Sequence, residues 1–301
     1  MRRKVALIGP ATLMISLPSK WAKRFGIKKG DELDLKENGS SLVVGFDKAN
    51  KIERTSIDVS ELSEQVIKWT LSALHKSGYD EIEVKYSDKK TLSVVQEMVK
   101  NVLMGFAIMD QNDKRVILRC VAQDVSTEFD AALRRAFLVT LALGENSLNL
   151  LKNNKFNELK ELIALEQTNN QLTNFCERIL NKRGIGDERA KSFLYVTVWN
   201  LEKLCDHYKD ICNLDINKVN RETLDLYKEV NALFNNYYEI FYKFDLNKLR
   251  DLETSAKDLS SKSGKIKNDR ELAHCLSNII SGVRNFFAST IALNQFAKSD
   301  S

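Results

Sequence analysis

Basic side chains gather at the amino end of this 301-residue chain, where they could bind a polyanion. Eight of the 46 Lys and Arg residues lie within residues 1–30, and that segment contains no Asp or Glu. The net charge is +5, yet all 41 acidic side chains follow residue 30. A cluster of this kind predicts contact with nucleic-acid phosphates, although a solvated basic face would have the same composition. The candidate DNA-binding residues are Arg2, Arg3, Lys4, Lys20, Lys23 and Arg24.

A second candidate site is an acidic pair, Glu202 and Asp206, within a stretch of helical periodicity. Residues four apart lie on the same face of a helix, so the two carboxylates point in a similar direction. Two carboxylates placed in this way can share a divalent cation or an iron- or zinc-type metal ion. More often such a pair belongs to a solvated face or binds Lys or Arg side chains. The residues by themselves leave both interpretations open.

No arrangement of residues predicts catalysis. The three histidines, His75, His207 and His274, are scattered and have no HxxxH or HExxH spacing. The sequence contains no GxGxxG, GxxxxGK[ST] or GxSxG motif. The five cysteines have no CxxC spacing and are expected to be buried thiols of a reducing cytoplasm. We therefore expect a cytoplasmic protein without a transmembrane helix that is not an enzyme.

The basic residues must be positioned by a small β-rich module at residues 1–47. Apolar residues alternate with period two from Val5 to Leu7 and again from Leu13 to Leu17, which is typical of half-buried strands. A short amphipathic stretch from Ser19 ends at Gly26, and Asn38-Gly39 is typical of a tight hairpin turn. Fewer than about fifty residues seldom form a hydrophobic core alone. We therefore expect a second copy of the chain to complete this core in a homodimer.

The acidic pair belongs to the larger part of the chain, where helical patterns dominate. Residues 50–122 alternate between helical and strand patterns and predict an α+β domain. From residue 126 to 298 apolar residues recur every three or four positions, in six helices arranged as two sets of three. The predicted fold class is therefore multidomain and mainly α, with a β-rich amino-terminal domain, an α+β middle domain and a six-helix bundle.

The first module resembles the AbrB/MazE/SpoVT family, whose fold is a swapped-hairpin DNA-binding dimer. The resemblance covers about forty-five residues and depends on Arg3-Lys4-Val5, Ile15-Ser16-Leu17-Pro18, Gly26-Ile27-Lys28-Lys29-Gly30-Asp31, Asn38-Gly39 and Leu42-Val43-Val44. It implies DNA contacts from Arg3 and Lys23, with Lys20 and Arg24 close by. The turn Gly9-Pro10-Ala11-Thr12 departs from relatives that hold an arginine there, which weakens the case for sequence-specific readout.

Residues 126–298 resemble the PhoU family, which regulates phosphate uptake with two three-helix repeats. The residues that carry this resemblance are Glu128 to Arg135, Glu166 to Asn170, Asn174 to Arg178 and Leu201 to Tyr208. It implies a metal site that uses Glu202 and Asp206, with Glu166 as a ligand from a partner motif ending at Asn170. In the second repeat the corresponding segment, 277–285, has no acidic pair.

The two resemblances together imply a homodimeric DNA-binding transcription regulator of phosphate uptake or homeostasis. The alternative is a PhoU-type adaptor that regulates a phosphate transporter or a kinase by protein–protein contact, with the first module serving only dimerisation. A metal-dependent phosphate esterase that uses the acidic pair is a third possibility. The expected partners are DNA, a second copy of the chain and a phosphate-transport or signalling protein.

Overall fold

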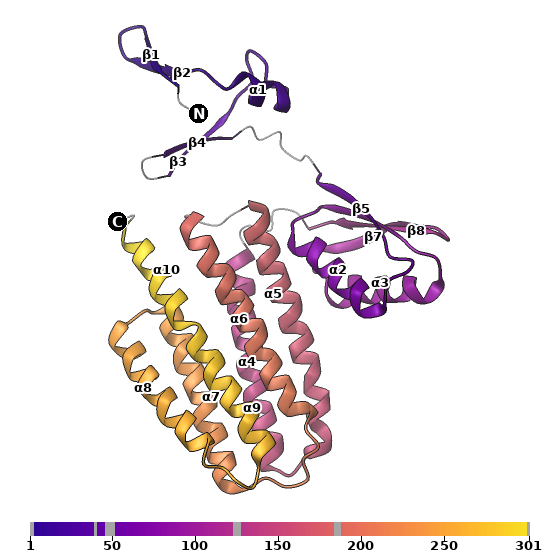
Figure 1. Ribbon diagram of the computed structural model, residues 1–301, viewed down its shortest axis with the longest axis vertical. Coiled ribbons are helices and arrows are strands. Elements are labelled where there is room, and N and C mark those ends of the chain that lie inside the picture. Colours follow the sequence, from indigo (N-terminus) through magenta and orange to yellow (C-terminus); the bar gives the residue numbers. More distant parts are fainter. Residues whose placement is uncertain (1–2, 39–40, 46–51, 123–127, 184–187, 300–301) are drawn as a thin grey trace. The chain divides into compact units, whose positions relative to one another are not determined.

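In the computed structural model the chain divides into two units, Met1–Ile52 and Glu53–Ser301. The structure describes residues 3–38, 41–45, 52–122, 128–183 and 188–299. The predicted domain boundaries at residues 47, 50 and 126, and the turn residue Gly39, lie outside these ranges. Figure 1 shows the order of the elements along the chain.

The amino-terminal unit contains two antiparallel hairpins with a short helix between them. Its elements are β1 (Val5–Ile8), β2 (Thr12–Ile15), α1 (Ser19–Phe25), β3 (Asp34–Asn38) and β4 (Ser41–Gly45). Gly9 turns the chain between β1 and β2 with a φ of 68°, a backbone conformation that favours glycine. This unit confirms the prediction of a small β-rich amino-terminal region.

The apolar side chains of these hairpins lack a core of their own. Leu7, Leu13 and Leu35 are between 62% and 70% exposed, and no described side chain of the unit is buried. Each of these strands pairs only within its own hairpin in the described chain. An isolated hairpin is marginally stable in water, so this unit needs apolar surface from elsewhere to fold stably.

The second unit begins with a four-stranded sheet covered on one face by two helices (Figure 1). Its elements are β5 (Arg54–Asp58), α2 (Glu64–Lys76), β6 (Glu81–Lys85), α3 (Lys89–Asn101), β7 (Phe106–Gln111) and β8 (Arg115–Cys120). The strand order is β5-β6-β8-β7, and only β5 and β6 are parallel because α2 forms the crossover between them. Ile82 and Val84 on β6 face the helices, whereas Glu81 and Glu83 lie on the open face.

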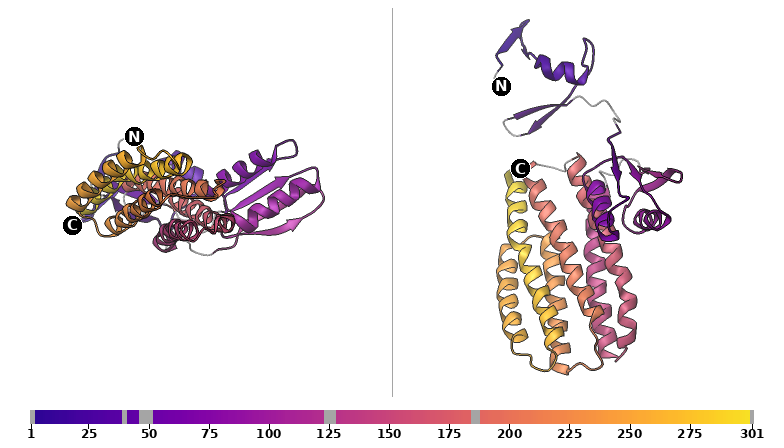
Figure 2. Two further views of the ribbon diagram at one scale, coloured as in Figure 1. Left: turned by 90° about the horizontal axis from the view of Figure 1, so that it is seen from below. Right: turned by 45° about the vertical axis from the view of Figure 1, so that its right-hand side comes forward.

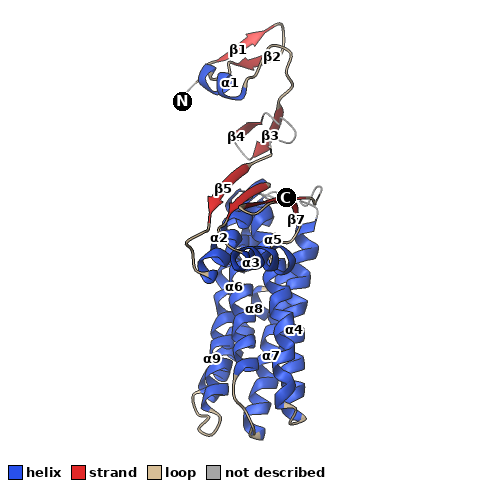
Figure 3. Cartoon of the chain, turned by 90° about the vertical axis from the view of Figure 1, so that its right-hand side faces the viewer, coloured by secondary structure: helices blue, strands red, loops and turns tan. Residues whose placement is uncertain are grey.

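Long helices form the rest of this unit, as Figures 2 and 3 show. They are α4 (Phe129–Lys152), α5 (Ile163–Arg183), α6 (Glu188–Asn213), α7 (Arg221–Tyr242), α8 (Leu246–Ser263), α9 (Arg270–Asn285) and α10 (Phe287–Ser299), with the 3-10 segment η2 (Phe156–Leu162) before α5. Their apolar stripes form one continuous hydrophobic core, and α10 follows α9 after the single residue Phe286. The helical part is therefore confirmed, while its division into two PhoU-type repeats remains a prediction.

The sheet and the bundle each have a hydrophobic core, and polar side chains join them where α2 lies against α5. Four of the five cysteines are buried as expected. Cys120 is only half-buried, because it lies at the end of β8 where the sheet stops. All five are free thiols.

Candidate functional site

Helix α1 presents three of the predicted DNA-binding cations. Lys20, Lys23 and Arg24 are all exposed, whereas Trp21 and Ala22 on the same helix are half-buried. Gly26 ends the helix with a φ of 65°, and its N–H donates to the carbonyl oxygens of the last turn. Because only glycine adopts this conformation at little cost, the helix stops after Phe25 and keeps its basic residues within two turns.

The remaining predicted cations precede β1. Arg3 and Lys4 are exposed, and Arg2 lies outside the described residues. The guanidinium of Arg24 lies 5.6 Å from the centre of the Phe25 ring, which steadies it on the helix surface. Exposed Lys and Arg side chains can neutralise backbone phosphates, and the release of the counterions held by those phosphates favours binding.

The structure brings the three predicted metal ligands to one seam between α5 and α6. Glu202 and Asp206 lie on α6, and Glu166 lies on α5. Their side chains are 16%, 28% and 7% exposed, so all three are largely withdrawn from water. Asn170 donates from its side-chain amide to Glu166 at 2.7 Å, which joins the two residues of the expected partner motif.

Lysine side chains bind these carboxylates. Lys209 Nζ lies 2.6 Å from Asp206 and 2.9 Å from Glu166. Lys203 Nζ lies 3.1 Å from Asp206 and 3.4 Å from Glu202. Among the described residues, no group of three or more His, Cys, Asp or Glu side chains could hold a metal ion.

The electrostatics of the seam favour charged side chains on both sides. Burial alone would raise the pKa of Asp206, but hydrogen bonds from Lys209 and Lys203 outweigh it and lower that pKa below 3.8. The pKa of Lys209 is raised, because the pull of Asp206 and Glu166 exceeds the effect of burial. The seam therefore consists of ion pairs at neutral pH.

A second cluster of charges joins the sheet to the bundle at the end of α2. The Arg178 side chain on α5 is 1% exposed and donates to the carbonyl oxygens of His75 at 2.9 Å and Tyr79 at 2.7 Å. It also pairs with Asp80 at 3.2 Å, and Lys182 binds the same carboxylate. Arg178 thereby binds two backbone carbonyl groups at and just beyond the end of α2.

Sequence patterns do not identify this junction between the sheet and the bundle. Lys76 and Arg178 are about one hundred positions apart, and no local periodicity connects them. Lys203 and Lys209 do have a local signal, since each stands three residues from Asp206 on the same helix. The adjacent buried charges Glu177 and Arg178 also lie beside the apolar stripe of α5.

Comparison with known proteins finds a similarity in the amino-terminal unit. Residues 7–50 match the family described as "Antidote-toxin recognition MazE, bacterial antitoxin". The match supports the resemblance to the AbrB/MazE type and a DNA-binding or antitoxin-type regulatory role. Searches of curated proteins and of solved structures found no match. The resemblance of residues 126–298 to PhoU proteins stays a prediction. None of the described helices is both long and apolar enough to span a membrane.

Proposed function

We propose that the chain is a homodimeric, DNA-binding transcription regulator that acts in the cytoplasm. One observation carries the proposal. Exposed cations on α1 stand in a unit that matches the MazE family and whose apolar strand residues are exposed. A second copy would cover that apolar surface and place about twelve cations on one dimer. No catalytic step is part of this proposal.

The regulated process that we propose is phosphate uptake or phosphate homeostasis. The support is the resemblance of residues 126–298 to PhoU proteins together with the helical fold of that region. The bundle would sense the state of the cell, and its rearrangement would alter the spacing of the basic residues on the dimer. Equal operator affinity with and without the helical part, under every phosphate condition, would contradict this coupling.

Salt titration of DNA binding tests the proposal. Contacts to six or more phosphates predict an affinity loss of about 1,000-fold between 50 and 200 mM salt. The triple variant Lys20→Glu, Lys23→Glu and Arg24→Glu should abolish binding to genomic DNA fragments. Fluorescence anisotropy at a series of salt concentrations measures both effects, and chemical crosslinking reports the dimer in parallel.

A matched control shows whether loss of DNA affinity comes from the residues of α1 or from the change in net charge. Lys160, Lys228 and Lys248 are exposed residues of the second unit, and changing all three to Glu alters the net charge by the same amount. This control should bind DNA like the parent chain. If both triple variants lose affinity equally, the assignment of the surface to α1 is wrong.

A protein adaptor is the second candidate function. The description of the matched family concerns recognition of a toxin, so it favours a binding partner other than DNA as well. In this case the amino-terminal unit would only dimerise, and the bundle would bind a phosphate transporter or a kinase. Salt-insensitive, weak DNA binding together with recovery of such a protein in the absence of DNA would favour the adaptor.

A further inference from the structure

Seven charged side chains form one unbroken chain of alternating sign at the seam between α5 and α6. Four are carboxylates and three are ammonium groups, and every neighbouring pair lies within ion-pair distance. In spatial order the chain is Glu177, Lys76, Glu202, Lys203, Asp206, Lys209 and Glu166. Glu202 and Asp206, two of the three predicted metal ligands, each have a lysine on both sides.

The middle of this chain is a poor site for a metal ion. A divalent cation needs carboxylate oxygens whose lone pairs are available, and it binds them only in the ionised form. The oxygens of Asp206 already meet ammonium groups at 2.6 Å and 3.1 Å. A metal ion there would have to displace Lys203 and Lys209 and then lie beside their positive charges.

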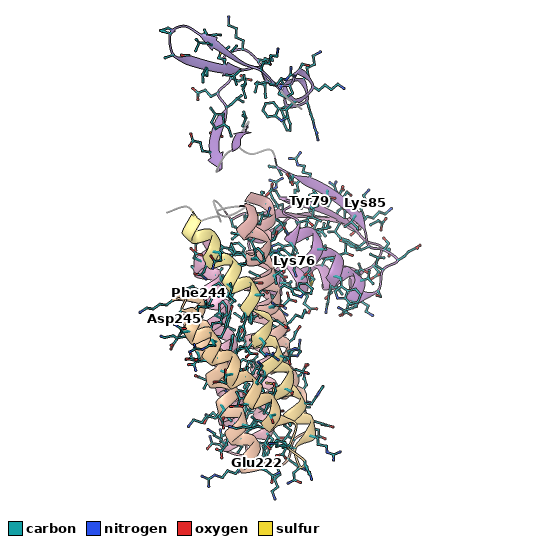
Figure 4. All side chains as sticks on the ribbon, turned by 60° about the vertical axis from the view of Figure 1, so that its left-hand side comes forward. Lys76, Tyr79, Lys85, Glu222, Phe244 and Asp245 are labelled. Atoms are coloured by element: carbon teal, nitrogen blue, oxygen red, sulfur yellow. The ribbon has the colours of Figure 1, made fainter. Side chains whose placement is uncertain are left out.

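Lys76 connects these charged side chains to the sheet part of the unit. It is the only member that the sheet part supplies, since it ends α2, whereas the other six members lie on α5 and α6. Its Nζ lies 2.7 Å from Glu177 and 3.5 Å from Glu202. The Glu177 side chain is completely buried, so loss of Lys76 would leave a buried carboxyl group without its cationic partner. Figure 4 shows Lys76 where α2 lies beside the bundle.

We propose that this seam supplies its own cations and works as a metal-independent joint between the sheet and the bundle. Lys203 and Lys209 stand where the resemblance to PhoU proteins would place a metal ion, and Lys76 anchors α2 to the same carboxylates. An ammonium group that is part of the chain is always present. The joint between the sheet and the bundle therefore forms at every metal concentration. Metal binding at this seam is then not the signal that the bundle senses.

Manganese binding to the full-length protein tests the claim that the seam binds no metal ion. With Mn²⁺ as the probe, we expect no saturable binding by calorimetry and no change in the thermal unfolding midpoint on adding Mn²⁺ or EDTA. The double variant Lys203→Met and Lys209→Met removes both lysines from Asp206, the lysine from Glu166 and one of the two lysines from Glu202. It should bind Mn²⁺ at least about tenfold more tightly. The charge-conserving variant Lys209→Arg should remain insensitive to Mn²⁺.

Two results would overturn the claim that the seam is independent of metal ions. One is stoichiometric Mn²⁺ binding by the parent chain that is lost in Glu202→Gln and Asp206→Asn. The other is a folded lysine variant with no gain in affinity. If the double variant does not fold, Lys203→Met replaces it, because Lys203 is 44% exposed and its removal leaves Lys209 in place.

Hydrogen exchange tests the claim that Lys76 anchors α2 to the bundle. Lys76→Met should raise amide exchange at least about tenfold in residues 71–82 by loosening α2 from the bundle, with α8 unchanged as an internal reference. Lys76→Arg keeps the charge and should retain the protection of the parent chain. Equal protection in Lys76→Met and the parent chain would show that Lys76 is not an anchor.

Discussion

The His75 imidazole is completely buried at the end of α2, and burial lowers its pKa to about 4. Its Nε2 donates to the carbonyl oxygen of Met104 at 3.0 Å, and the ring lies against Phe106. The unfolded chain protonates His75 near pH 6.5, whereas the folded chain resists protonation until about pH 4. The unfolded state therefore binds more protons in that window. The stability that depends on His75 is fully present above pH 6.5 and falls with acidity down to about pH 4.

We expect His75→Gln to reduce this loss, because glutamine can donate to Met104 without titrating. Between pH 7.5 and pH 5 the parent chain should lose about 2 kcal/mol more of its free energy of unfolding than the variant does. Urea denaturation at the two pH values measures the difference. His274 is exposed, so His274→Gln should follow the parent chain. Parallel pH profiles for His75→Gln and the parent chain would contradict the assignment.

At the scale of elements, α4 approaches α6 and α7 closely at Gly144. A Cβ atom at this position would lie 2.7 Å from a ring carbon of Tyr208 and 2.9 Å from the side-chain oxygen of Asn231. Asn231 also donates to the Gly144 carbonyl at 2.8 Å and accepts from Tyr208 at 2.9 Å. The absence of a side chain therefore sets how closely these three helices pack.

Gly144→Ala should destabilise the bundle although alanine favours helix formation. The added methyl group must displace buried partners, and we expect a net cost of about 1–3 kcal/mol in the free energy of unfolding. Chemical denaturation measures it. Gly264 ends α8 at a φ of −65°, and its nearest neighbours lie 3.7 Å or more from a Cβ. Gly264→Ala should be neutral or slightly stabilising, and an equal cost at both glycines would refute the role of Gly144.

The helices could be predicted from sequence more completely than the strands. Apolar residues three and four apart bury one side of α6 or α7 whatever its neighbours are, so local periodicity is sufficient. Strand β5 has the sequence Arg-Thr-Ser-Ile-Asp, whose single aliphatic residue gives no alternating apolar pattern. It spans Arg54–Asp58 because pairing with β6 determines its position, and that pairing involves residues 27 positions away.

The same distinction applies to the candidate sites. The cations of α1 lie within five residues of one another in sequence, so composition alone identified them as a group. The spacing of Glu202 and Asp206 predicted their common direction, and both lie in the seam. The cation that binds Glu202 from α2 could not be predicted, because the packing of two distant helices brings Lys76 there. A local pattern cannot show whether a carboxylate faces a metal ion or an ammonium group.

At the scale of the whole molecule, the two units should differ in how their stability depends on protein concentration. Both hydrophobic cores lie within the second unit. A fragment of residues 53–301 should therefore unfold in one cooperative transition at a midpoint independent of concentration. A fragment of residues 1–52 should be stabilised by dilution-sensitive dimerisation. Circular dichroism at protein concentrations spanning about 100-fold measures both midpoints. A concentration-independent midpoint for the short fragment would contradict the proposed dimer.

The Asp80 carboxylate fixes the place where the second unit begins. It accepts a hydrogen bond from the N–H of Glu53, the first residue of that unit, and it also binds Arg178 and Lys182 of α5. Glu53, where the second unit begins, is thus linked through Asp80 to the bundle helix α5. Sliding α5 by one residue, about 1.5 Å, would pull Glu53 by a similar step.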